Sequence, residues 1–313
     1  MKGERGFALV ITLIVTALLV ALAAEFVNEV YVETSLSHNF VDGQQASLLA
    51  ASGVDGGVAL LRFTTASQGY TTLADSWAKP LKMEDERGGL TVIIEEESAK
   101  LNLNTVAGDN GTFLPPFSDV FLRLLKKQGI SSDVADALAD WIDTNDEPHP
   151  GGAETSYYSS LRPPYKVKNG FLDTVEELCL VKGVTRDVLA NKLQPYVTVY
   201  SDSGLAAAVT KININTVPRQ LLLALHEDMT DSLAKEIEDY RKQTPFQNIG
   251  DLSKVSGMRT QMVSALSGVC TCTGKVFRIR SEARVRETTR LVEAVVRMSG
   301  TRAMVIYWRE YTP

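Results

Sequence analysis

The chain begins with its longest run of apolar residues. Phe7 to Ala24 covers eighteen positions without a charged side chain, and only Thr12 and Thr16 interrupt the apolar pattern. A helix rises 1.5 Å per residue, so this segment would span roughly 27 Å, close to the hydrocarbon thickness of a bilayer. Lys2 and Arg5 outnumber the single acidic residue before it. That positive end predicts an N-terminus held in the cytoplasm, with the rest of the chain beyond the membrane.

Three interpretations of this segment compete. It is a secretory signal peptide with a small-residue cleavage site at 21–23, a plain membrane anchor, or a class III leader cut between Gly6 and Phe7 with the helix retained. Apolar residues keep a helical period from Phe26 to Thr34, past the end of the apolar run. A signal peptide that is removed gives no reason for that continuation. The pattern therefore favours cleavage between Gly6 and Phe7.

Residues 25–63 continue as one long predicted helix. Six small residues line its face between Ala46 and Gly57, and because glycine is unfavourable inside a helix, they indicate close packing against this face. Residues 64–88 read as a polar connector, and Leu90 to Glu97 alternates as a strand.

Two sequence patterns occur twice. Lys100–Val106 and Lys211–Val217 both place Asn-x-Asn-Thr among apolar residues, which predicts a half-buried strand followed by a capped helix. Leu178–Val184 and Leu252–Met258 share a second pattern that resembles the hairpin of helix-hairpin-helix and SAM-like families. The simplest arrangement is two related modules with a helical domain between the Asn motifs.

The C-terminal region predicts a β-meander. Val276–Val285 alternates apolar and polar residues, and 286–290 reads as a turn. Leu291–Met298 and Ala303–Glu310 are predicted as the second and third strands. One face of this sheet is apolar and the other is rich in arginine. We expect the long N-terminal helix to pack on the apolar face.

Composition narrows the function. Of 313 residues, 44% are hydrophobic and 22% charged, which is typical of globular proteins rather than disordered ones. The net charge of −6 argues against nucleic acid as a partner. The three histidines, His38, His149 and His226, fall in no catalytic or zinc pattern, and the odd number of cysteines leaves their pairing open. We therefore expect no enzyme.

The densest chemistry lies in residues 131–160, which hold seven carboxylates and no lysine or arginine. The first four aspartates, spaced by three or four positions, are predicted on one face of a helix that buries Val134, Leu138 and Ile142. The loop after it is rich in oxygen ligands of the kind that calcium prefers, although Pro148 stands where an EF-hand needs glycine. The alternative is a solvated acidic surface. The carboxylates are Asp133, Asp136, Asp140, Asp143, Asp146, Glu147 and Glu154.

Together these features resemble the protein K family of minor pseudopilins in type II secretion systems. The resemblance covers the whole chain and is carried by the Gly6–Phe7 junction, the paired Asn motifs and the segment Ala139–Pro148 with Gly152–Glu154. Ile11 occupies the fifth mature position, where most pilin-like subunits have glutamate. Lack of that glutamate is itself typical of the K subunits.

The resemblance implies an α+β fold, in which a pilin-like N-terminal helix packs on a C-terminal antiparallel sheet and a large all-α, SAM-like domain is inserted. The implied segments are a leader at 1–6, a transmembrane helix at 7–24, the helix and first strands at 25–106, the inserted helical domain at 107–205, and the remainder of the pilin-like domain with a helical hairpin and meander at 206–313.

It also implies a non-enzymatic subunit at the tip of a periplasmic pseudopilus, anchored in the inner membrane and processed by a prepilin peptidase with methylation of Phe7. Its partners would be the I, J and H subunits, contacted through the small-residue face of 46–57. Calcium would be bound by Asp143, Asp146, Glu147 and Glu154. The alternative function is a membrane-anchored or secreted helix-hairpin-helix protein that binds nucleic acid during DNA uptake.

Overall fold

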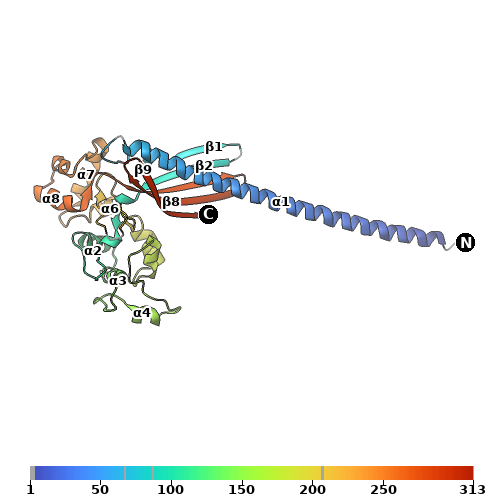
Figure 1. Cartoon of the computed structure of the whole chain (residues 1–313), viewed down its shortest axis with the longest axis horizontal. Coiled ribbons are helices and arrows are strands. Elements are labelled where there is room, and N and C mark those ends of the chain that lie inside the picture. Colours follow the sequence, from blue (N-terminus) through green and yellow to red (C-terminus); the bar gives the residue numbers. More distant parts are fainter. Residues whose placement is uncertain (1–3, 67, 87, 206–207, 313) are drawn as a thin grey trace.

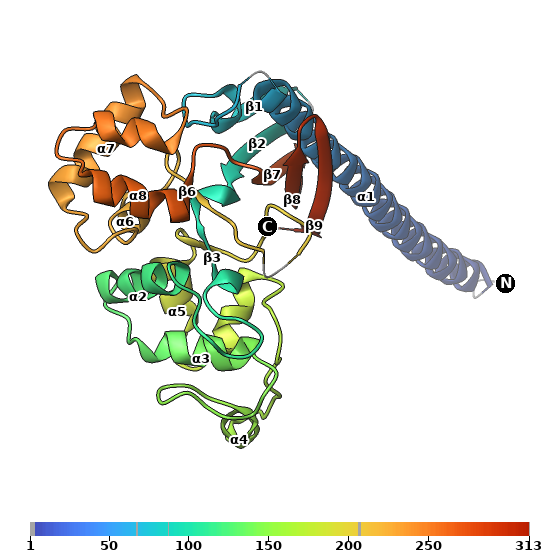
Figure 2. The ribbon, with the colours of Figure 1, turned by 60° about the vertical axis from the view of Figure 1, so that its left-hand side comes forward.

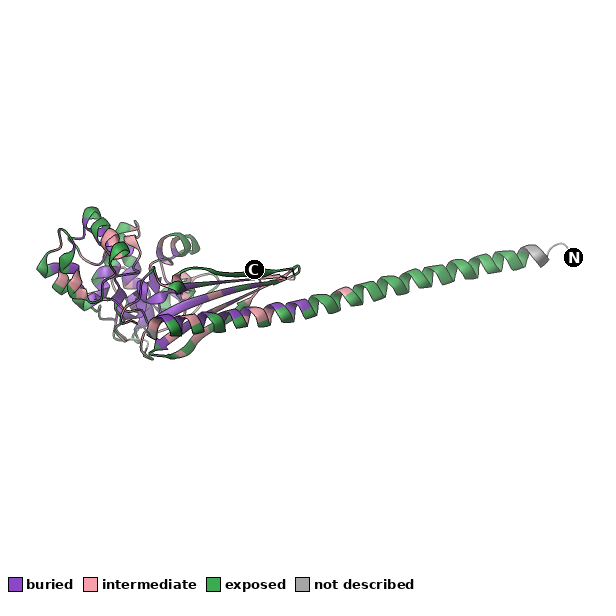
Figure 3. Ribbon diagram, turned by 90° about the horizontal axis from the view of Figure 1, so that it is seen from above, coloured by how far each residue is buried: buried purple, intermediate pink, exposed green. Residues whose placement is uncertain are grey.

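The N-terminal half of the molecule is dominated by one helix. The computed structural model describes residues 4–66, 68–86, 88–205 and 208–312, and α1 (Glu4–Ala66) runs 63 residues without a break. Its first part projects far from the rest of the molecule, whereas its C-terminal part lies along the sheet (Figures 1 and 3). By length and composition α1 can cross a membrane. The continuous helix expected from the sequence is therefore confirmed.

A five-stranded antiparallel sheet lies beneath the C-terminal part of α1. Its order is β1-β2-β7-β8-β9, so β2 joins the meander at β7 and β9 forms the far edge. The predicted meander is confirmed, but β8 already begins at Thr288, paired with Val285, and the turn is shorter than expected. The sequence did not predict β1. The strands are β1 (Leu81–Asp85), β2 (Gly88–Glu96), β7 (Val276–Val285), β8 (Thr288–Ser299) and β9 (Arg302–Tyr311).

The small residues of α1 bring the helix close to this sheet. Ala46 and Ala50 are fully buried, and a Cβ at Gly53 would lie only 2.1 Å from the hydroxyl of Ser281 on β7. Close packing was predicted correctly, but its partner was not. The expectation that this face joins a neighbouring subunit is wrong, because the chain's own sheet covers it.

The remaining elements form two modules that repeat one pattern (Figure 2). Each begins with a two-residue strand at the Asn motif and ends with a two-residue strand that pairs with it in parallel. Gly183 and Gly257 take the same positive φ in the two hairpins, 84° and 82°. The first module contains β3 (Leu101–Asn102), α2 (Phe117–Lys127), α3 (Asp133–Ile142), α4 (Thr155–Ser160), α5 (Arg186–Val188) and β4 (Val197–Thr198). The second contains β5 (Ile212–Asn213), α6 (Arg219–Leu222), α7 (Asp231–Gln243), α8 (Thr260–Val269) and β6 (Cys270–Thr271).

The second asparagine of each motif acts as a clamp. The side chain of Asn104 donates to the carbonyl of Leu172 and accepts from its backbone amide, at 2.9 and 2.8 Å. Asn215 makes the same pair of bonds with Phe246, both at 2.9 Å. The clamp tethers the segment before each hairpin and satisfies buried backbone groups.

This clamping explains why the Asn motif is not the half-buried strand expected from alternation. The apolar and the polar residues of Leu101–Thr105 are all buried, and the strand lasts two residues before a 3-10 turn. Alternation of apolar and polar residues predicts a solvent-exposed face only where the polar side chains have no hydrogen-bond partner in the protein interior.

Two apolar cores divide the molecule. One lies between α1 and the sheet, and the other runs continuously through both modules. The helices of the second module thus share a core with the first module, and the sheet contributes Val276 and Val295 to that core. The sequence-based domain boundaries, including that at 205/206, stay predictions.

Two consecutive buried glutamates join the sheet to the modules. Glu96 ends β2 and accepts a 2.9 Å hydrogen bond from the side chain of Asn213 in the second module. Glu97 accepts from the hydroxyl of Thr198 in the first module, at 2.5 Å, and from Arg278 of β7, at 2.8 Å. Arg278 is also bonded to Glu293 of β8.

The pKa values of these two carboxyls are shifted in opposite directions. Burial raises the pKa of Glu96 to about 7, against hydrogen bonds from Asn213 and Thr71. Burial would also raise the pKa of Glu97, but the cations Lys100 and Arg278 outweigh it and hold that pKa at about 2. A buried carboxylate is stable only where such partners compensate for lost water.

The ion pair of Glu97 with Arg278 predicts that the stability of the folded chain falls in acid. Folding lowers the pKa of Glu97 below its ordinary value, so its contribution is present above pH about 4.5 and is lost as the pH falls toward 2. We expect the melting temperature of the detergent-solubilised chain to fall between pH 5 and 3. Glu97→Gln should melt lower at pH 7 and lose less over the same interval. Equal acid sensitivity of the two proteins would contradict this assignment.

Candidate metal centre

The acidic cluster forms where α3 ends. The helix stops at Ile142, and Asp143 is extended, with φ −73° and ψ 166°. Asp143 therefore does not continue the helical face of Asp133, Asp136 and Asp140, as the spacing had predicted. The side chain of Asp143 instead accepts the backbone amide of Asn145, at 3.1 Å, which turns the chain into the loop.

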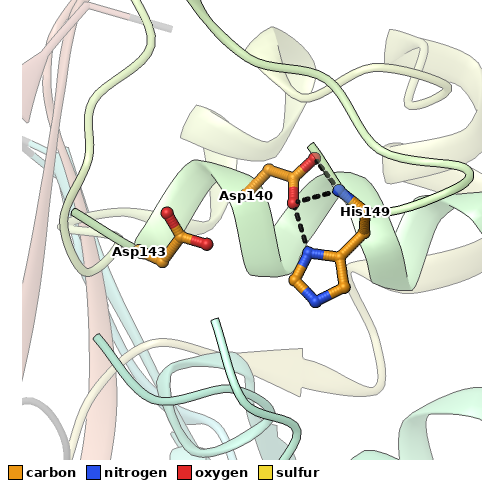
Figure 4. Close-up of side chains that lie close together, drawn as sticks. All are labelled: Asp140, Asp143 and His149. Carbon is orange, nitrogen blue, oxygen red and sulfur yellow. Dashed lines mark hydrogen bonds and ion pairs between the residues drawn. The ribbon is translucent and has the colours of Figure 1, made fainter. Parts of the chain in front are cut away.

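Asp140 is fixed by the returning loop. Its carboxylate accepts backbone amides of His149, at 3.1 Å, and Ala153, at 2.6 Å. The ring Nδ1 of His149 lies 2.5 Å from the same carboxylate (Figure 4). One ligand atom from each of Asp140, Asp143 and His149 falls within a group 4.8 Å across. Asp140 thus ties the start and the end of the loop together.

Asp143 and Glu154 are buried without enough partners. They are 0% and 2% exposed, and among the described residues Asp143 Oδ2 and both carboxylate oxygens of Glu154 have no hydrogen-bond partner. A Cβ at Gly111 would lie 2.5 Å from Asp143 Oδ2, so the glycine leaves space beside that oxygen. Buried polar atoms in native proteins nearly always have partners. Three such oxygens in one loop indicate that a cation or a proton completes the site.

The electrostatics agree with this geometry. Burial, and then the charges of Asp140, Asp143 and Asp146, raise the pKa of Glu154 to about 8. Burial also raises the pKa of Asp143, partly offset by the amide of Asn145. Both groups are held in an environment that disfavours a lone negative charge.

The four predicted ligands occupy different surroundings. Asp143 and Glu154 are the buried, unsatisfied pair, whereas Asp146 and Glu147 have exposed side chains. Asp146 still lies at the loop, because it accepts the amide of Thr155 at 3.1 Å. Sequence reasoning assigned no ligand role to Asp140 or His149. The only available signal was the position of Asp140 three residues before Asp143.

The donor set suits a hard cation. Carboxylate oxygens are the preferred ligands of calcium, which accepts six to eight oxygens in flexible geometry. The unsatisfied oxygens of Asp143 and Glu154 supply such donors, and the loop places Asp146 beside them. The residues present therefore fit calcium.

The fold defines a class of protein. A long apolar N-terminal helix whose C-terminal part packs on an antiparallel sheet is the pilin-like architecture, here extended by two helical modules. Two family models described as "Type II secretion system (T2SS), protein K" match residues 99–202 and 212–269. The chain belongs to this family, and is a minor pseudopilin of the type II secretion system.

Individual relatives agree. The type II secretion system protein K of Pectobacterium carotovorum is 28% identical, over 98% of this chain and 96% of its own length. A putative protein K of Escherichia coli K12 is 31% identical, over 74% and 73%. That of Pseudomonas aeruginosa is 28% identical, over 90% and 85%.

The fold has a close structural counterpart. A chain in the crystal structure of the GspK–GspI–GspJ complex from enterotoxigenic Escherichia coli matches with a TM-score of 0.74. The match covers 90% of this chain and all of that chain, at 20% sequence identity. The predicted fold class is thus confirmed. The nucleic-acid alternative finds no support in these comparisons.

Proposed function

We propose that the chain is a non-enzymatic subunit at the tip of a short periplasmic pseudopilus, where it helps to initiate assembly for the export of folded proteins. The observation that carries this proposal is the bulk of the two modules at the end of α1 opposite to the N-terminus. A head of that size hinders a further subunit from stacking above it. Ile11 adds to the argument, because it lacks the charge that would contact a preceding subunit.

Its proposed partners are the I and J subunits, with H below. The complex named for the structural counterpart joins K, I and J proteins, which supports this choice. The small-residue face of 46–57 is not proposed as the contact, since the sheet buries Ala46, Ala50, Gly53 and Gly57 and leaves only Gly56 fully exposed. The projecting part of α1 instead exposes large apolar side chains, among them Phe26, Tyr31 and Phe40. Exposed apolar surface of this kind marks an interaction site.

Co-purification tests the proposal. The detergent-solubilised chain, co-expressed with its own I and J subunits, should elute as a complex with one copy of this chain. Omission of the I and J subunits provides the control and should leave the chain unassembled. Recovery mainly of homopolymers of this chain would contradict a tip position.

The proposed location is the inner membrane, crossed once by 7–24, with the folded region in the periplasm. A prepilin peptidase would cut between Gly6 and Phe7 and leave a methylated Phe7. Of the leader, residues 1–3 lie outside the described residues. The support is the unbroken α1, since cleavage near Ala24 would cut a helix that continues into the folded region.

Intact mass decides how the chain is processed. The membrane-extracted protein should have the mass of a chain that starts at Phe7, with one added methyl group. Gly6→Val should retain the leader, because the residue before the cut is then too bulky, whereas Gly3→Val is the matched control and should not. A mature chain that starts at Ala24 would refute the pilin-type processing.

We propose that the acidic loop binds calcium through Asp143 and Glu154, with Asp146 as a further ligand. When bound, the ion would neutralise the buried carboxylates and hold residues 143–154 in one conformation. Asp140 is already saturated by hydrogen bonds and would position the loop around the ion. Glu147 was also predicted as a ligand, but of the two exposed residues only Asp146 is among the charges that act on Glu154, so Glu147 is left out of this arrangement.

Glu154→Gln should have opposite effects with and without calcium. In chelator at neutral pH the variant should melt higher than the natural chain, because folding then no longer has to protonate a buried carboxyl whose pKa is raised to about 8. In calcium it should melt lower, since the natural chain gains about 2.7 kcal/mol at a hundredfold excess of free ion over the dissociation constant. The exposed Glu236→Gln serves as the control and should change neither. If the melting curve of the natural chain is the same with and without chelator, the loop does not bind calcium and is an ordinary acidic loop.

A further inference from the structure

One hollow on the surface is lined by three arginines that form no ion pair within the described part of the chain. It has a volume of about 600 Å³ and lies at the turn between β8 and β9, beside the end of α1. Arg62 reaches it from α1, Arg297 from β8 and Arg302 from the start of β9, and the hydroxyls of Ser299 and Thr301 also line it. Three separate elements thus bring positive charge to one place in a chain whose net charge is −6.

Several arginines elsewhere in the chain are neutralised within it. Arg278 and Arg280 of β7 and Arg286 of the following turn each form an ion pair with a carboxylate. Within the described part of the chain, none of the three hollow arginines does so, and the one hydrogen bond among them joins Arg297 to the carbonyl of Ser201, at 2.9 Å. The nearby carboxylate of Asp202 is already bound to Lys275. Like charges brought together without counter-charges favour an anionic ligand.

The surroundings indicate a protein ligand rather than a small anion. Met304 lines the hollow and is 60% exposed, and Ala303 lines it beside Arg302. Arginine and methionine are among the types enriched at protein interfaces. A small anion would neutralise the arginines but leave these apolar side chains in water.

The position excludes lipid headgroups of the anchoring membrane. With the proposed span at 7–24, Arg62 stands 38 residues further along α1. At 1.5 Å per residue this is roughly 57 Å from the bilayer. The hollow therefore lies far out on the side of the molecule that points away from the membrane.

We propose that this hollow is a docking site for an acidic segment of a partner protein, with carboxylates on the arginines and apolar residues on Ala303 and Met304. Apart from the distance to lipid, which rests on the proposed membrane anchoring, the argument depends only on the folded chain. The segment carries alternating acidic and apolar residues, because the hollow offers both kinds of contact side by side.

The test uses the purified full chain in detergent and a fluorescent peptide of alternating Glu and Leu. Binding should be saturable, weaken with salt and be lost when Gln replaces Glu. Arg62→Glu with Arg302→Glu should weaken it by about tenfold or more, because two charges that attract the peptide are replaced by two that repel it. Lys127→Glu with Lys235→Glu makes the same change in net charge on distant exposed sites and should have little effect.

Other outcomes overturn the proposal. They are no saturable binding, equal loss in both double variants, or equal binding when Ser replaces Leu, which would mean a simple anion site that inorganic phosphate could fill. Melting temperatures of both variants verify that they fold. Because the assay contains no I or J subunit, its failure is distinct from a failure of the tip complex.

Discussion

The arrangement of this molecule depends on two carboxylates buried side by side at the end of β2. Glu96 reaches the Asn motif of the second module, and Glu97 reaches the last strand of the first. Arg278 connects Glu97 to β8 through Glu293, so one ion network spans sheet and module. Apolar contact alone does not fix the orientation of the modules relative to the sheet. A buried charged or polar group is stable only in the geometry that gives it its partners. This junction therefore sets how the modules are held relative to α1.

The repetition of one structural unit in the two modules explains the rest of the architecture. Both modules use the same Asn clamp, the same glycine conformation in the hairpin and the same closing parallel strand pair. They differ chiefly between α3 and the clamped segment, where the first module has the long acidic loop and the second passes from α7 to Phe246 within a few residues. The candidate metal centre is thus an insertion into one copy of a common unit, which gives that copy a chemistry the other lacks.

Much of the fold could be predicted because its signals are local. The apolar run predicted α1, and alternation predicted β7, with two further strands after it. Strand β1 was missed because its alternation covers only Leu81 to Glu84, inside a polar connector, and all five of its residues are exposed. The partner of the small residues was also misjudged, since periodicity shows that Gly53 packs closely but not that Ser281, far away in sequence, is what it packs against. At the site, the acidic loop was predicted from composition and the ligand role of Asp143 and Glu154 from the family resemblance, whereas the role of Asp140 depends on a loop that returns to it.

Hydrogen exchange tests the central role of the two glutamates most directly. Glu97→Ala should raise exchange at the amides of β3 and β4 in the first module, and Glu96→Ala at those of β5 and β6 in the second. The amides between α1 and the middle of the sheet should change little in either variant, because their core is separate. Exchange that rises uniformly across both modules in both variants, or in neither, would contradict the claim that each glutamate holds one module.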